Sequence, residues 1–95
     1  MESAEPVDFT THWLRAAGRR FGLQEAEKAD EVMRQACALG RLNEEFVDEV
    51  GRAVDHDIRK TVESLAMRVP AEKLAVFEKA ARRAYRKFAK EHAEP

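Results

Sequence analysis

Cysteine is the scarcest reactive residue in this sequence, since Cys37 stands alone among 95 residues. A single cysteine excludes an internal disulfide and a cluster of thiolate ligands, and it favours a reducing compartment. No apolar run approaches the roughly 20 residues that a membrane-spanning helix needs. The acidic opening, MESAEPVDF, lacks the basic and apolar regions of a secretory signal. We therefore expect a cytoplasmic protein with no membrane span.

Glycine and histidine are also too sparse and scattered for several kinds of site. The 4 glycines occur singly, which excludes a glycine-rich phosphate loop. The sequence contains no Glu-x-x-His pair of the kind that binds iron in helical bundles. A chain this short also has little room for a desolvated catalytic pocket. We expect no enzyme activity, no catalytic residues, no metal site and no cofactor.

What the sequence does contain is typical of a helical protein. Alanine, glutamate, arginine and lysine dominate, and no alternating strand pattern of useful length occurs. We predict an all-α fold, a small four-helix bundle or helical array, with residues 1–7 as a flexible acidic leader and 8–95 as a single helical domain. The predicted helices run from Asp8 or Thr10 to a stop at Gly22, from about 24 to 39, from about 44 to 68, and from about 70 to 92.

The turn before the third predicted helix carries the clearest local signals. Gly40 suits a left-handed C-terminal cap, and Asn43 suits an N-terminal cap, with acidic residues in the first turn that follows. The third helix then shows apolar residues spaced by three and four: Phe46, Val47, Val50, Val54, Ile58, Val62, Leu65 and Val69. Because this helix is longer than the two before it, part of this stripe is expected to need a partner chain.

Small residues predict where helices approach each other closely. The inner face of the second predicted helix holds mostly alanines together with Cys37, which we expect to be a buried thiol. Gly51 interrupts the long third helix, where it marks either a close helix crossing or a kink. Pro70 suits the first position of the fourth helix.

Charge is distributed unevenly along the chain. Residues 1–58 carry 7 Lys/Arg against 13 Asp/Glu, whereas residues 59–95 carry 10 against 5. The segment 79–90 holds cations without any acid: Lys79, Arg82, Arg83, Arg86, Lys87 and Lys90. These six residues are the candidate binding site. They form a solvated helix face, or they meet an acidic protein, a nucleic-acid backbone or an anionic membrane surface.

A second candidate lies in the third predicted helix. His56 is followed by an acid, an aliphatic and a basic residue, in the order His56-Asp57-Ile58-Arg59. This stretch resembles the H-box of sensor histidine kinases, and the resemblance implies that His56 is a phosphoacceptor with Asp57 as its polarising acid. That family usually has Thr or Asn at the place of Lys60. The other interpretation is a solvated helix face with ion pairs four residues apart.

Taken together, these features favour a small non-catalytic protein-interaction module, such as an adaptor, a regulator or a subunit of a larger assembly. It would bind through helix faces, with electrostatic steering by the basic fourth helix. The alternatives are a nucleic-acid-associated protein that uses the basic helix 79–90 and a phosphotransfer domain with His56 as acceptor. The expected partner is a protein, and self-association into a homo-oligomer is an open alternative.

Overall fold

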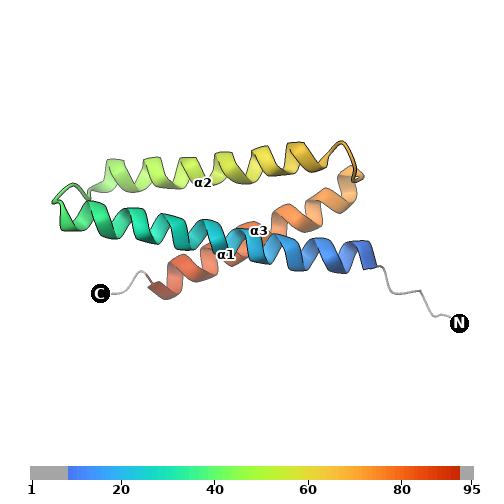
Figure 1. The fold of residues 1–95 in the computed structure, drawn as a ribbon, viewed down its shortest axis with the longest axis horizontal. Coiled ribbons are helices and arrows are strands. Elements are labelled where there is room, and N and C mark those ends of the chain that lie inside the picture. The colour runs from blue at the N-terminus through green and yellow to red at the C-terminus, as the bar shows by residue number, and fades with distance from the viewer. Residues whose placement is uncertain (1–8, 93–95) are drawn as a thin grey trace, which may run out of the picture.

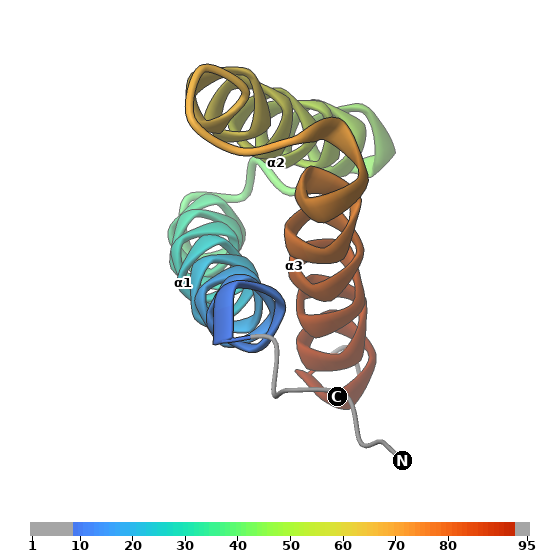
Figure 2. The same cartoon turned by 90° about the vertical axis from the view of Figure 1, so that its right-hand side faces the viewer.

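The computed structural model describes residues 9–92, which form three α-helices joined by short turns. Helix α1 spans Phe9–Ala38, α2 spans Glu44–Leu65 and α3 spans Ala71–His92. Helix α2 runs antiparallel to α1, and α3 crosses obliquely behind them (Figure 1). The closest packing joins α1 and α3, whereas α2 lies across them and contacts each over a shorter stretch (Figure 2). The described part of the chain is thus all-helical, as the sequence predicts.

The prediction of four helices is wrong, because the first two predicted helices are one continuous helix, α1. The error lies at Gly22, which the sequence places at a helix end. Gly40 is the only glycine with a positive φ in the described chain, so Gly22 needs no left-handed conformation. Gly22 lies instead inside α1 and is buried. Its lack of a side chain serves packing and does not terminate the helix.

Gly18 and Gly22 allow the backbone of α1 to rest directly on α3. A Cβ atom added to Gly18 would collide with the carbonyl oxygen of Phe77, and one added to Gly22 would collide with that of Ala81. The two glycines are one helical turn apart and therefore lie on the same face of α1. Side chains on the same side of the helix, including Leu14 and Ala26, continue this buried face. The α1–α3 contact is the most tightly packed part of the molecule.

The turn between α1 and α2 forms as predicted. Gly40 has a φ of 72°, and its N–H donates to the carbonyl of Cys37 at 3.1 Å. The N–H of Arg41 donates to the carbonyl of Ala36 at 2.7 Å, which completes the pair of bonds that defines a Schellman cap. At the start of α2, Asn43 Oδ1 accepts the N–H of Phe46 at 2.8 Å. Local side-chain chemistry therefore fixes this junction.

At the junction between α2 and α3, helix α2 ends earlier than the sequence predicts. Helix α2 ends at Leu65, although the sequence predicts helix to about residue 68, and residues 66–69 form turns. Helix α3 begins at Ala71, so Pro70 immediately precedes it. The Pro70 carbonyl accepts the N–H groups of Lys73 and Leu74 at 2.9 and 3.0 Å. The predicted leader, residues 1–7, and residue 8 lie outside the described residues.

The core is small for a chain of this length. Leu14, Ile58 and Phe77 are the most deeply buried large side chains among the described residues, each 4% exposed or less. Of the predicted apolar stripe on α2, only Val54 and Ile58 are buried. The radius of gyration is 16.2 Å, against about 12 Å for a compact domain of this size. The fold is an open three-helix array, about 60 Å in its longest dimension, which leaves several apolar side chains at the surface.

Candidate docking groove

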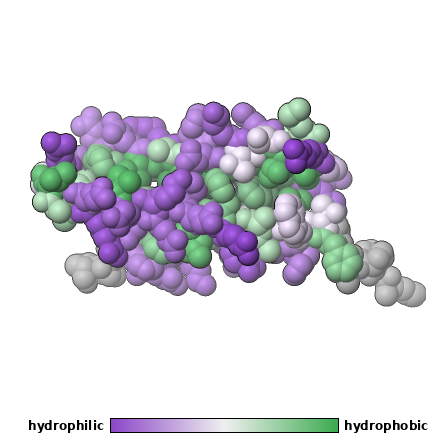
Figure 3. Space-filling model, viewed as in Figure 1, coloured by the Kyte–Doolittle hydropathy of each residue, from purple (hydrophilic) through white to green (hydrophobic). Residues whose placement is uncertain are grey.

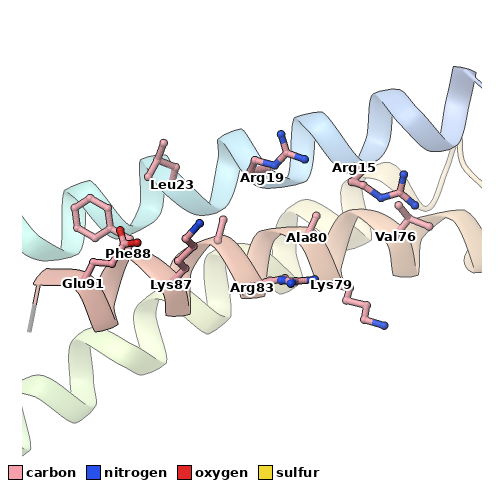
Figure 4. A pocket seen from close by; sticks show the side chains of 11 residues that line it. Arg15, Arg19, Leu23, Val76, Lys79, Ala80, Arg83, Lys87, Phe88 and Glu91 are labelled. Atoms are coloured by element: carbon pink, nitrogen blue, oxygen red, sulfur yellow. The ribbon is translucent and has the colours of Figure 1, made fainter.

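A groove with a volume of about 660 Å³ runs between α1 and α3 (Figure 4). Helix α1 contributes Arg15, Arg19 and Leu23, which recur every four residues. Helix α3 contributes the remaining lining residues: Val76, Lys79, Ala80, Arg83, Ala84, Lys87, Phe88 and Glu91. The lining therefore combines five cations, one acid and five apolar side chains. Such a surface offers apolar contact and positive charge together.

The groove follows from the close contact of the two helices. Gly18 and Gly22 bring the backbone of α1 onto α3, and the small Ala80 and Ala84 leave space beside that contact. Long cationic side chains on both helices surround this space, with their aliphatic stems lying over apolar surface. In Figure 4, Lys87 extends from α3 toward α1. A hollow with an apolar lining and a charged rim results.

The six cations predicted as a binding site do not all lie on one surface. Lys79, Arg83 and Lys87 line the groove at intervals of four residues. Arg86 and Lys90 are exposed but lie outside its lining. Three of the six residues thus lie on one continuous surface, where two arginines from α1 join them.

Arg82, the remaining member of that set, faces α2. Its Nη1 lies 2.6 Å from Asp55 Oδ1, and its Nη2 lies 3.0 Å from Glu78 Oε2. Asp55 also pairs with Arg59 at 3.1 Å, one of the ion pairs that the sequence predicts on α2. The hydrogen bond from Arg82 holds the pKa of Asp55 below its usual value. The role of Arg82 in this structure is to join α3 to α2.

Sequence reasoning missed Arg15 and Arg19, because both lie in the half of the chain that is acidic overall. Their spacing from each other and from Leu23 is the one signal that could have drawn attention to them. That spacing marks a single helix face, but it does not say which other helix the face adjoins. The cations of the groove therefore come from both parts of the sequence, including the part that is acidic overall.

An aromatic pair lies at one end of the groove. The ring of Phe88 stacks on that of His92 with centroids 3.9 Å apart and planes 10° apart. His92 Nδ1 also lies 3.0 Å from the carbonyl oxygen of Phe88. These contacts fix the orientation of Phe88, so this end of the groove presents an ordered apolar side chain.

A buried polar cluster, which the sequence analysis did not predict, joins residues of all three helices. Glu25 of α1 is only 5% exposed and pairs with Lys28 at 3.1 Å. Burial is the main cause that raises the pKa of Glu25, and a hydrogen bond with Asp57 of α2 acts in the same direction. Burial and the nearby charge of Glu25 also raise the pKa of Tyr85 on α3. This cluster places a carboxyl group in an unfavourable environment for its charge.

The other candidate residues lie apart from the groove. His56 is exposed on α2, and its role as a phosphoacceptor stays a prediction. Cys37 is exposed, so the prediction of a buried thiol is wrong; it lies in the last turn of α1, where α3 does not cover it. Within residues 9–92, no cluster of three or more metal-ligating side chains occurs, and no helix is both long and apolar enough to cross a bilayer.

Comparison of this chain with protein-family models, with curated proteins and with solved structures finds no match. The fold and the groove define the class as a small all-helical protein with a cationic interhelical surface. Inference about its function therefore depends on the chemistry of that surface.

Proposed function

We propose that this protein is a non-catalytic interaction module that binds an acidic amphipathic helix of a partner protein in the groove between α1 and α3. The observation that carries the proposal is the joint lining of five cations and five apolar side chains, contributed by two adjacent helices. An amphipathic helix that enters a groove buries its apolar face and leaves its polar face at the rim. Cations at the rim select a helix whose flanking residues are acidic.

The composition of the lining favours a protein over a nucleic acid. Proteins that bind single strands stack bases on exposed aromatic side chains, and Phe88 is the only aromatic residue in the lining. Its ring is already stacked on His92. Leu23 and Val76 suit aliphatic partners better than base edges. A nucleic-acid backbone would contact the cations through its phosphates but would leave the apolar part of the lining exposed.

Binding of a synthetic helical peptide tests the proposal. The probe carries leucines on one face and glutamates on the other, and its affinity is measured by fluorescence anisotropy. The double variant Arg83→Glu with Lys87→Glu should weaken binding by about tenfold or more, because it reverses charge inside the groove. The matched control, Arg86→Glu with Lys90→Glu, makes the same change in net charge outside the lining and should weaken binding by less than about threefold.

The alternatives give different outcomes in the same assay. Equal loss in both double variants would contradict a defined groove and indicate general charge attraction. A duplex or single-stranded DNA that displaces the peptide, with an affinity that falls steeply with salt, would support the nucleic-acid function instead. Acid-labile labelling of His56 by acetyl phosphate, absent in His56→Gln, would support phosphotransfer.

A further inference from the structure

A second surface of α1 carries exposed aromatic side chains. Phe9 is 76% exposed and Trp13 is 61% exposed, and the two lie one helical turn apart on the same face. In Figure 3, apolar surface is visible toward the end of the molecule where α1 begins, between α1 and α2. Neither residue lines the groove between α1 and α3. Exposed apolar patches of this kind mark interaction surfaces in soluble proteins.

A shallow hollow adjoins this aromatic pair on the same face. It has a volume of about 250 Å³, which exceeds the roughly 150 Å³ of a cavity that accepts benzene. Its lining consists of Trp13, Ala16, Ala17, Arg20, Phe21 and Gln24. Trp13 forms one end of this hollow, so the face presents an exposed aromatic ring and, beside it, a hollow large enough for one that extends to Gln24.

Two copies of this face can pair with each other about a two-fold axis. In an antiparallel pair of α1 helices that cross between Ala16 and Ala17, Trp13 of one copy lies opposite Arg20 of the other. Two-fold contacts need each surface to complement itself, and here the Trp13 ring lies on one side of the crossing point while the hollow extends to Arg20 and Gln24 on the other. The two alanines allow the helices to approach closely, because they leave room for the neighbouring backbone.

Charge on this face also suits a second copy. Arg20 would lie over the indole ring of the other copy, a favourable cation–π arrangement. The two Arg20 side chains would be separated by about 10 Å along the helix axis, so their repulsion is largely screened at physiological salt. Phe9 would reach Gln24, which is uncharged. Neither Phe9 nor any residue that lines the hollow is acidic, so no two acidic side chains would face each other across the contact.

From this geometry we propose that two copies of the chain associate through antiparallel contact of α1, with Trp13 of each copy seated in the hollow of the other. The exposed fractions of Phe9 and Trp13 leave roughly 250 Å² of aromatic surface to bury per copy. Together with the adjoining turns of α1, the contact would bury about 1,200 Å² of surface in total, which is near the lower limit of specific interfaces. The dimer is accordingly weak, with a dissociation constant in the range of about 10 µM to 1 mM.

Sedimentation equilibrium of the full chain tests this inference directly. The mass should rise from one chain to two across that concentration range. Trp13 is the single tryptophan, so its fluorescence should shift to shorter wavelength over the same range as the ring leaves water. A mass that stays at one chain up to about 1 mM would overturn the inference.

Matched variants separate this contact from others. Trp13→Ser should weaken association by about tenfold or more, and Arg20→Gln by a smaller factor. Arg52→Gln, which removes the same charge from an exposed position on α2 outside both surfaces, should leave association unchanged. Trp13 and Arg20 are both exposed, so their substitution should preserve the fold, which circular dichroism verifies. A dimer that persists in Trp13→Ser would place the contact elsewhere and overturn the inference, whatever the result for peptide binding in the groove.

Discussion

At the scale of single residues, the glycines of this protein serve different purposes that their identity alone does not distinguish. Gly40 adopts a left-handed conformation, and Gly22 permits two helices to touch. Gly51 does neither, because a Cβ atom there would meet nothing within 4 Å. The prediction that Gly51 marks a close helix crossing is therefore wrong, and the close contact lies at Gly18 and Gly22.

Alanine substitutions at two of these glycines should have opposite effects on stability. Gly51→Ala should increase the free energy of unfolding by about 1 kcal/mol, because alanine is favoured in an exposed helix interior. Gly22→Ala should decrease it by about 1–3 kcal/mol, because the backbone of α3 must move. Urea denaturation measures both. A stabilised Gly22→Ala variant would contradict the close contact of α1 and α3.

The raised pKa of Glu25 predicts that the stability of the protein depends on pH. Since this pKa is raised in the folded protein, the folded state binds more protons than the unfolded state at pH values between the ordinary pKa near 4.5 and the raised pKa. Stability attributable to this group should therefore fall as pH rises through that raised pKa. Glu25→Gln should melt at a higher temperature than the wild type at neutral pH and show less pH dependence. The control Glu27→Gln, at an exposed neighbour, should follow the wild-type profile.

At the scale of elements, the attachment of α2 depends on few contacts. Val54 and Ile58 provide its buried apolar surface, and the pair of Asp55 with Arg82 links it to α3. This limited contact explains why the other five residues of the apolar stripe on α2 stay half-buried or exposed.

Removal of that ion pair should destabilise the protein in a pH-dependent manner. Because Asp55 has a lowered pKa, its contribution is present above its ordinary value and is lost as the pH falls through its folded value, below about pH 4. Arg82→Gln should therefore lower the melting temperature at neutral pH, and the difference should shrink in acid. Arg86→Gln removes the same charge from an exposed position and should have little effect at either pH. Equal effects of the two substitutions would contradict the assignment of Arg82 to the α2–α3 contact.

Element boundaries could be predicted where they depend on neighbouring residues and not where they depend on distant ones. Gly40 and Asn43 act within a few residues of themselves, so the sequence correctly predicts the end of α1 and the start of α2. The role of Gly22 depends on α3, which lies about sixty residues away in sequence. The placement of Arg15 and Arg19 on the same groove as Arg83 depends on the same packing, so only three of the five groove cations could be predicted.

At the scale of the whole molecule, one helix contributes to two separate surfaces. One face of α1 forms a wall of the cationic groove, and another face carries Trp13 and its hollow. A small core leaves both faces available for contact, because little apolar surface is consumed inside the fold. Two copies joined through α1 would present two grooves, which increases the apparent affinity for a partner that carries two acidic helices.

Nuclear magnetic resonance mapping tests the central claim most directly. Addition of the acidic amphipathic peptide to isotopically labelled protein should shift amide signals along both walls of the groove, at Arg19, Leu23, Ala80 and Ala84, and leave those around His56 on α2 unchanged. Shifts confined to α2, or spread evenly over the cations that lie outside the groove, would contradict docking between α1 and α3.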